Sequence, residues 1–241
     1  MMILLSPAKS LDFESDFNCQ ISSIPQFEKE AQKLSSELKK FSALDLEKLM
    51  DISPKLATLN FERWKNFKKN PARQALLAFD GDVYAGIEKG KFDEQDFNFT
   101  QDHLRILSGL YGILRPLDLI KPYRLEMGFS HKNLYEFWRE KLVKEINNSD
   151  AKYLINLASE EYFAAIDQKK ITQPIINISF KEKKNGALKI IGINAKKARG
   201  LMTNFAIRNR ITNPEKLKDF SQENYKFDKK ISDKNNWVFT R

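Results

Sequence analysis

Cysteine and histidine are scarce in this chain of 241 residues, which contains one cysteine and two histidines. The single Cys19 excludes an internal disulfide and any four-cysteine zinc or iron–sulfur site. His103 and His131 lie far apart without metal-ligand spacing, and the paired Glu-x-x-His motifs of a di-iron bundle do not occur. We therefore expect no haem, zinc or ferroxidase chemistry and no bound cofactor.

Long hydrophobic runs are also missing, since no stretch approaches the roughly eighteen apolar residues that a membrane span requires. The apolar run Met1–Leu5 has no basic segment before it and meets Ser6-Pro7-Ala8-Lys9 at once, unlike a secretory signal. Apolar residues make up 41% of the chain and charged residues 30%, which is typical of a folded protein and not of a disordered one. We expect a cytoplasmic protein without a membrane partner.

The charge is unbalanced toward the basic side, with 41 Lys and Arg against 32 Asp and Glu and a net charge of +9. This excess permits a polyanionic partner without proving one. Between residues 181 and 199 a single acid, Glu182, stands among seven basic residues, Lys181, Lys183, Lys184, Lys189, Lys196, Lys197 and Arg199. The lysines at 181–184 lie beside a predicted turn, where a merely solvated face is an equally good interpretation.

The order of predicted elements indicates an α/β protein of the mixed α+β kind. The first residues read as a buried strand that ends at Ser6-Pro7, residues 26–69 as helices with a start signal at Ser53-Pro54, and Asn185-Gly186 as a hairpin turn. Further helices are predicted at 100–112, 131–147, 159–163, 195–210 and from Asn213, and further strands at 153–157, 174–180, 187–193, 225–227 and 237–240. A hairpin among alternating strands and helices favours one compact domain over residues 1–241, with a mixed sheet and surrounding helices.

Polar residues follow three of the predicted strands. The first strand leads to Lys9, the strand at 153–157 leads to Ser159, Glu160 and Glu161, and the hairpin leads to Asn194, Lys196, Lys197 and Arg199. In α/β sheets, ligand sites commonly form where strands end and helices begin. If these strand ends are adjacent, they form a cleft with several cations beside a carboxylate.

The predicted helix at 195–210 has two different faces. Ala198, Leu201, Met202 and Phe205 recur at helical spacing and predict the core face. Lys196, Arg199 and Thr203 share the opposite face, with Gly200 between them, so a phosphate could approach the backbone there. The alternative is that Gly200 only permits close packing; a glycine inside a helix costs about 1 kcal/mol relative to alanine and so usually has a reason.

A second group of residues lies in the segment Leu104–Asp118, where a predicted helix meets Gly109 and Gly112. Glycine-containing hairpins expose backbone N–H groups that can hold a phosphate without reading bases. Nearby cations would add to this attraction: Arg105, Arg115, Lys121 and Arg124. The alternative is an ordinary helix end with buried leucines.

Six runs of residues are distinctive when taken together. They are ILLSPAK at 3–9, FDGDVYAG at 79–86, LRILSGLYGILRPLDLIKPYRLEMG at 104–128, NLYEFW at 133–138, INLASEEYF at 155–163 and AKKARGLM at 195–202. With these runs in this order, the sequence resembles the bacterial peroxide stress response protein YaaA family over nearly its whole length.

The resemblance implies a cytoplasmic protein that protects against hydrogen peroxide and against damage from free iron. It also implies a single α/β globule with a basic cleft that binds duplex DNA and carries a helix-hairpin-helix motif. Gly109–Gly112 is the candidate for that motif, although Tyr111 adds one residue to the usual Gly-apolar-Gly pattern. A helix pair within 26–69, which lacks glycine, is the alternative.

Sequence-nonspecific DNA binding is the leading functional hypothesis. The residues expected to contact DNA are Lys9, Arg105, Gly109, Gly112, Arg115, Lys121, Arg124, Lys196, Lys197 and Arg199. Such binding weakens steeply with salt, because each neutralised phosphate releases counterions.

Two alternatives stay open. In the first, the same cleft takes a small phosphorylated or nucleotide-like ligand, with Glu160 or Glu161 and Lys9 as catalytic groups. No phosphate loop of the Gly-x-x-x-x-Gly-Lys type occurs, but carboxylates at strand ends would repel DNA. In the second, iron is bound directly by the one dense acidic group, Asp80, Asp82, Asp93, Glu94 and Asp96.

Overall fold

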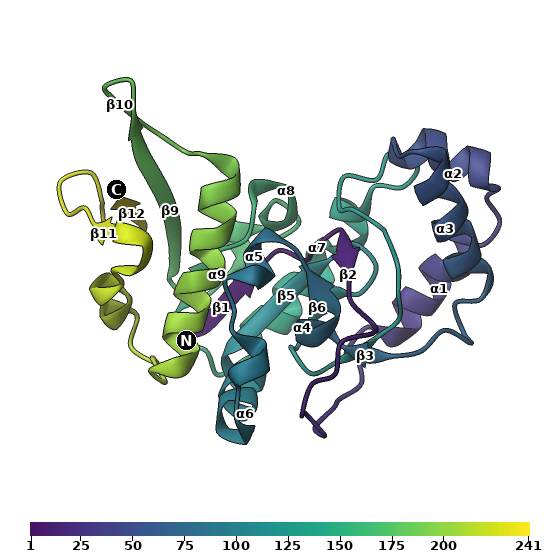
Figure 1. Ribbon diagram of the computed structural model, residues 1–241, viewed down its shortest axis with the longest axis horizontal. Coiled ribbons are helices and arrows are strands. Elements are labelled where there is room, and N and C mark those ends of the chain that lie inside the picture. Colours follow the sequence, from purple (N-terminus) through teal and green to yellow (C-terminus); the bar gives the residue numbers. More distant parts are fainter.

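The computed structural model describes all 241 residues, and a mixed sheet runs through its centre (Figure 1). The strand order is β11-β12-β9-β8-β1-β5-β6, and β10 pairs with β9. The strands are β1 (Met2–Leu5), β5 (Leu104–Ser108), β6 (Gly112–Leu114), β8 (Leu154–Asn156), β9 (Ile175–Lys184), β10 (Ala187–Lys189), β11 (Lys226–Phe227) and β12 (Asn236–Thr240).

The central strands β1, β5, β8, β9 and β12 run parallel, whereas β6, β10 and β11 pair antiparallel with their neighbours. All four residues of β1 are buried, which explains why this strand is a continuous apolar run and not an alternating one. The mixed α/β fold predicted from the sequence is therefore confirmed. Because β1, β8 and β9 are parallel neighbours, their carboxyl ends meet at one edge of the sheet.

Helices lie on both sides of this sheet. The segments α5 (Asp82–Ala85), α6 (Glu94–His103) and α9 (Gly192–Arg208) lie in front of it in Figure 1, and α7 (Leu134–Asn147) lies behind. Two short helices, α4 (Ala75–Ala78) and α8 (Glu160–Phe163), complete the cover. Together with the strands they enclose a contiguous core of 60 buried residues.

Three helices form a helical arm at one end of the molecule, far from the β9–β10 hairpin at the other end (Figure 1). The arm consists of α1 (Glu28–Leu38), α2 (Ala43–Met50) and α3 (Pro54–Lys65). Ser42 and Asp45 form a capping box at the start of α2, and the Ser53 hydroxyl caps α3 just before Pro54. The helix start predicted at Ser53-Pro54 is therefore confirmed.

Several short elements connect these parts. Two small ladders join β2 (Ser10–Leu11) to β4 (Phe79–Asp80) and β3 (Arg73–Gln74) to β7 (Leu119–Ile120). Short 3₁₀ turns occupy Lys89–Lys91, Gln168–Lys170, Pro214–Asp219 and Gln222–Asn224. The predicted turn at Asn185-Gly186 is confirmed by positive φ angles of 52° and 79° at these two residues. The helix predicted from Asn213-Pro214 is one of the 3₁₀ turns.

The helix predicted at 100–112 is wrong. α6 ends at His103, and the chain then forms the β-hairpin β5–β6 beside the central strand β1. Both faces of β5 are largely buried, so its apolar residues do not alternate and a buried strand looks like a buried helix in the sequence. Gly112 adopts a φ of +71°, and a Cβ there would lie 2.6 Å from the Trp138 ring.

No helix in the structure has both the length and the apolar character that crossing a bilayer demands.

Candidate functional site

The carboxyl ends of β1 and β8 are joined by a hydroxyl pair. The Ser159 backbone N–H donates to Ser6 Oγ at 2.8 Å, and the two serine hydroxyls lie 3.1 Å apart. The Tyr84 hydroxyl donates to the Ser6 carbonyl at 2.9 Å, so α5 is held against the same strand end. Segments separated by 153 residues in the chain thus meet here, so the adjacency that the sequence analysis posed as a condition holds for the first strand and the strand before Ser159.

Two glycines set how closely α5 approaches α9. A Cβ on Gly200 would lie 1.8 Å from the Val83 carbonyl oxygen, and a Cβ on Gly86 would lie 2.7 Å from the Lys197 carbonyl oxygen. The space beside Gly200 is therefore filled by protein backbone, and no gap is left there for a phosphate. The interpretation of Gly200 as a ligand gap is wrong, and its close-packing alternative is correct. The packing instead brings α5 beside the helix that carries Lys196 and Arg199.

These contacts surround a pocket of about 360 Å³, which we call the strand-end pocket. The β2–β4 ladder pairs Ser10 with Asp80 and so adds the loop before α5 to the wall. The lining residues come from four parts of the chain: Ser6, Pro7, Ala8, Lys9, Ser10, Asp80, Gly81, Asp82, Val83, Tyr84, Ser159, Glu161, Tyr162, Lys196 and Arg199. This volume lies within the usual range for small-ligand sites.

The charges in the strand-end pocket are mixed. Three cations, Lys9, Lys196 and Arg199, line it together with three carboxylates, Asp80, Asp82 and Glu161. Of these six groups only Lys9 forms an ion pair. Its Nζ lies 2.8 Å from a carboxylate oxygen of Glu126, which does not line the pocket. The pocket thus holds opposite charges that do not neutralise one another by direct contact.

Burial shifts the pKa of two tyrosines and one arginine in this region. Burial raises the pKa of both Tyr84 and Tyr162, so both phenols stay protonated and can donate hydrogen bonds at neutral pH. Burial lowers the pKa of the Arg199 guanidinium, which nevertheless stays charged. The Arg199 Nε is buried without a hydrogen-bond partner.

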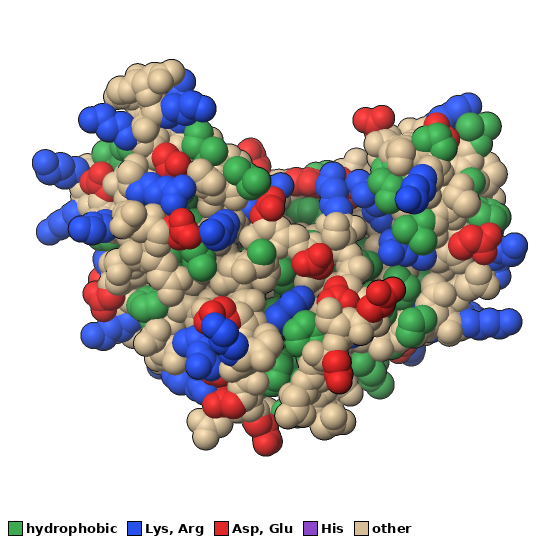
Figure 2. Space-filling model, in the orientation of Figure 1, with side chains coloured by type: hydrophobic (Ala, Val, Ile, Leu, Met, Phe, Trp, Pro, Cys, Tyr) green, Lys and Arg blue, Asp and Glu red, His purple; other side chains and the backbone are tan.

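A second recess of about 170 Å³ adjoins the strand-end pocket, and Glu161 lines both. We call it the arm recess because Leu49 and Met50 of α2 form one wall. Arg124 donates to Glu126 at 3.0 Å, and the Gly128 N–H contacts Glu161 at 3.3 Å. Figure 2 shows a hollow between the helical arm and the β9–β10 hairpin, and the elements β2, α5 and α8, which contribute to the strand-end pocket, lie between these two ends in Figure 1.

Comparison with known proteins assigns the chain to a family. Residues 1–231 match the family described as peroxide stress protein YaaA. The chain is 47% identical to a UPF0246 protein of Acaryochloris marina and 45% identical to a UPF0246 protein of Crocosphaera subtropica, with both proteins covered over 100% of their length. The chain belongs to the YaaA family. The resemblance inferred from the sequence is confirmed, and membership of this family supports a role in peroxide stress.

The structure of this YaaA family member brings together some of the predicted DNA-contacting residues. Lys9, Lys196 and Arg199 line the strand-end pocket, and Arg124 lines the arm recess. Lys197 points elsewhere and pairs with Glu223 at 2.8 Å. Glu161, and not the exposed Glu160, faces the pocket.

Other predicted contacts lie away from the hollow. Arg105 stands near the amino end of β5 and donates to the carbonyls of Gln101 and Leu104, while Arg115 pairs with the buried Asp118. Lys121 donates to the Lys68 carbonyl in a separate depression. These three cations therefore do not share the site of Lys196 and Arg199.

Gly109 and Gly112 occupy the buried β5–β6 hairpin, where a Cβ on Gly109 would lie 2.3 Å from the Leu125 carbonyl oxygen. The helix-hairpin-helix assignment for this segment is wrong, because the chain there forms strands and its glycines are covered by protein. The helices of 26–69 do exist, and α2 and α3 follow one another across residues 51–53.

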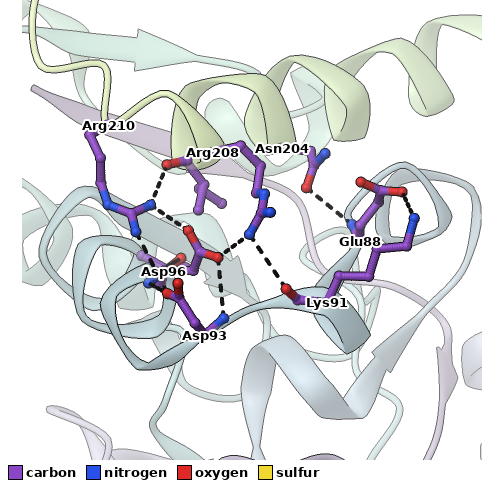
Figure 3. Close-up of polar contacts among 9 residues, drawn as sticks. Glu88, Lys91, Asp93, Asp96, Asn204, Arg208 and Arg210 are labelled. Atoms are coloured by element: carbon purple, nitrogen blue, oxygen red, sulfur yellow. Dashed lines mark hydrogen bonds and ion pairs between the residues drawn. The ribbon is translucent and has the colours of Figure 1, made fainter.

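The dense acidic group is divided between two places. Asp80 and Asp82 line the strand-end pocket, whereas Asp93 and Asp96 cap α6 and pair with Arg208 at the end of α9 and with Arg210 just after it (Figure 3). No group of three or more His, Cys, Asp or Glu side chains is placed to hold a metal ion. The FDGDVYAG run carried the sequence signal for Asp82 and Tyr84, but their place beside Ser6 depends on contacts between distant segments.

Proposed function

We propose that this protein acts in the cytoplasm during peroxide stress by binding duplex DNA, without sequence specificity, in the hollow between the helical arm and the β9–β10 hairpin. Membership of the peroxide stress family supports the physiological setting. The observation that carries the DNA proposal is that cations without carboxylate partners occur on the β9–β10 hairpin, on the floor of the hollow and on the helical arm.

These cations occur in three places. On the hairpin side none of the four lysines forms an ion pair: Lys181, Lys183, Lys184 and Lys189. On the floor, Lys196 and Arg199 are likewise unpaired, and on the helical arm Lys48, Lys55 and Arg63 have no carboxylate partner. The pKa of Arg63 is lowered by burial and by the nearby Arg124, which indicates positive charge gathered at this end of the hollow.

The carboxylates of the floor limit how DNA would lie. Asp80, Asp82 and Glu161 would repel phosphates that enter the strand-end pocket deeply. The duplex would therefore rest on the hairpin lysines and the helical arm, with its backbone passing over Lys196 and Arg199. Contacts of this kind fix position but do not read base edges.

Salt titration tests the proposal. Fluorescence anisotropy of a labelled duplex, measured at several salt concentrations, should give a log–log slope that grows by about 0.9 for each phosphate neutralised. The variant Lys183→Gln/Lys184→Gln/Lys189→Gln should bind more weakly and with a shallower slope. Failure of the wild-type protein to bind at about 50 mM salt would contradict the proposal.

A matched variant controls for loss of net charge. Lys144→Gln/Lys152→Gln/Lys169→Gln removes three lysines without ion pairs from α7 and from the turns that precede β8 and β9, at the amino edge of the sheet. This control should keep nearly the wild-type slope. Equal loss in both triple variants would show that net charge, and not the hollow, governs binding.

A further inference from the structure

We infer that the strand-end pocket is a binding site for a phosphomonoester, such as the 5′-phosphate of a nucleotide. Arg199 and Lys196 bind the phosphate, and the carboxylates accept hydrogen bonds from hydroxyl or N–H groups of the same ligand. This inference does not depend on duplex binding along the hollow.

Arg199 gives the main reason. Its guanidinium has no carboxylate within 4.0 Å and makes no hydrogen bond to any protein acceptor, although its Nε is buried. Two other half-buried arginines have carboxylate partners, Arg73 with Asp12 and Arg241 with Glu182, whereas Arg63 on the helical arm has none and lies beside Arg124. A partly buried cation without an acceptor is costly, so a partner that the protein itself does not supply is expected.

Lys196 identifies that partner as an anion with more than one charge. It lines the same pocket from the preceding turn of α9, is exposed, and forms no ion pair. An arginine and a lysine three residues apart on one helix lie on the same face. Two cations on one face match a doubly charged phosphomonoester better than a carboxylate.

The rest of the pocket favours a ligand that carries hydrogen-bond donors besides its phosphate. Asp80, Asp82 and Glu161 occupy other parts of the lining and would repel the phosphate, so it is directed toward α9. The same carboxylates can accept hydrogen bonds from sugar hydroxyls or from base N–H groups. The Ser6 and Ser159 hydroxyls lie at the base of the pocket between β1 and β8 and offer further polar contacts.

Isothermal titration calorimetry with adenosine 5′-monophosphate, ribose 5-phosphate and their unphosphorylated forms tests this site. We expect both phosphorylated probes to bind at least about tenfold more tightly than adenosine or ribose, since charge-assisted hydrogen bonds to phosphate are strong. Equal binding of adenosine and its monophosphate, or no binding of either phosphorylated probe at about 10 mM, would overturn the inference.

Substitutions locate the binding. Arg199→Gln should weaken adenosine monophosphate binding by about tenfold or more, whereas Arg139→Gln on α7 removes the same charge elsewhere and should leave it unchanged. If Arg199→Gln does not fold, Lys196→Gln serves instead, because this lysine is exposed and makes no contact that the fold needs. Wild-type affinity in both pocket variants would contradict the assignment.

A DNA end carries the same chemical group, and a further pair of probes separates the two sources. A short duplex is compared with and without a 5′-phosphate. A gain on phosphorylation that Arg199→Gln abolishes supports the site with DNA ends as ligand. Duplex binding that is unaffected by phosphorylation, together with tight mononucleotide binding, supports the site with a free nucleotide. If the wild-type protein binds the duplex but not the mononucleotide, this site is overturned and the proposed duplex binding stands.

Discussion

The middle and the carboxyl end of α9 present arginines in opposite circumstances. At the carboxyl end, Arg208 and the following Arg210 both contact Asp96, whose side chain is only 2% exposed (Figure 3). In the middle of the helix, Arg199 lines the strand-end pocket without any protein acceptor. The ion pairs at the carboxyl end therefore fasten α9 to α6, whereas the charge in the middle of the same helix has no partner in the protein.

The ion-pair end has a wider polar setting. Asp93 and Asp96 form a capping box at the start of α6, and the Asn204 side chain of α9 accepts the Glu88 N–H at 3.1 Å. Asp96 thus serves both as a helix cap and as the anion for two arginines. We expect changes at this end to affect stability and changes at Arg199 to affect binding.

Asp96→Asn should have the largest effect on stability. It leaves Arg208 and Arg210 without their shared anion, and loss of one partner of a buried ion pair costs about 3 kcal/mol. Urea unfolding followed by circular dichroism measures the loss. Asp102→Asn, at an exposed position of α6 without an ion pair, is the control and should change stability by less than about 0.5 kcal/mol. Similar losses in the two variants would contradict the structural role of Asp96.

Gly200→Ala tests the close packing that places α9 beside α5. The new Cβ would meet the Val83 carbonyl at 1.8 Å, so the helices must separate at a cost of about 2 kcal/mol. Gly192→Ala, in the first turn of α9 where a Cβ meets nothing within 4 Å, should be neutral or stabilising. A Gly200→Ala protein as stable as the wild type would show that this packing does not hold the pocket wall.

The pH dependence of stability should also report on Asp96. Burial opposes ionisation of Asp96, but hydrogen bonds and charge from Arg210 and Arg208 outweigh it, and the pKa is lower in the folded protein. A lowered pKa stabilises the fold above the unfolded-state pKa of about 3.9, and this stabilisation is lost as pH falls through the folded-state pKa. The difference in unfolding free energy between wild type and Asp96→Asn should therefore shrink between about pH 6 and pH 3. A difference that stays constant across this range would refute the ion-pair explanation.

Arg199→Gln should have the smallest effect on stability. It removes a partly buried charge that lacks a protein partner, so the unfolding free energy should stay within about 0.5 kcal/mol of wild type or rise. Thermal unfolding without ligand makes the comparison with Asp96→Asn direct. A loss as large as that of Asp96→Asn would assign Arg199 to the fold instead of to a ligand.

Local sequence signals predicted local structure well. The buried strand at β1, the cap at Ser53-Pro54 and the Asn185-Gly186 turn each depend on residues close together in the chain, and the structure confirms them. The helix predicted at 100–112 is wrong because a strand buried on both faces lacks the alternation that would distinguish it. The strand β5 is buried because it pairs with β1, which lies about a hundred residues earlier in the chain.

The site was only partly predictable for a similar reason. The meeting of Lys9 and Ser159 follows from the parallel strands β1 and β8 ending at one edge of the sheet, whereas Lys196 and Arg199 reach the pocket through the packing of α9 against α5. The role of Gly200 could not be read from its own helix, because its neighbour is the carbonyl of Val83 on another element. Charge alone also failed to separate paired cations from free ones, as Lys196 and its neighbour Lys197 show.

Hydrogen–deuterium exchange with and without a short duplex most directly tests whether phosphate groups bind in the hollow. The account predicts that DNA protects the backbone at 6–10, 124–128, 159–162 and 181–199, which belong to the hollow and its hairpin side. Residues 144–153 and 167–174, which precede β8 and β9 at the amino edge of the sheet, should be unaffected. Protection confined to the β5–β6 hairpin and to Arg115 and Lys121, with none in the hollow, would contradict it.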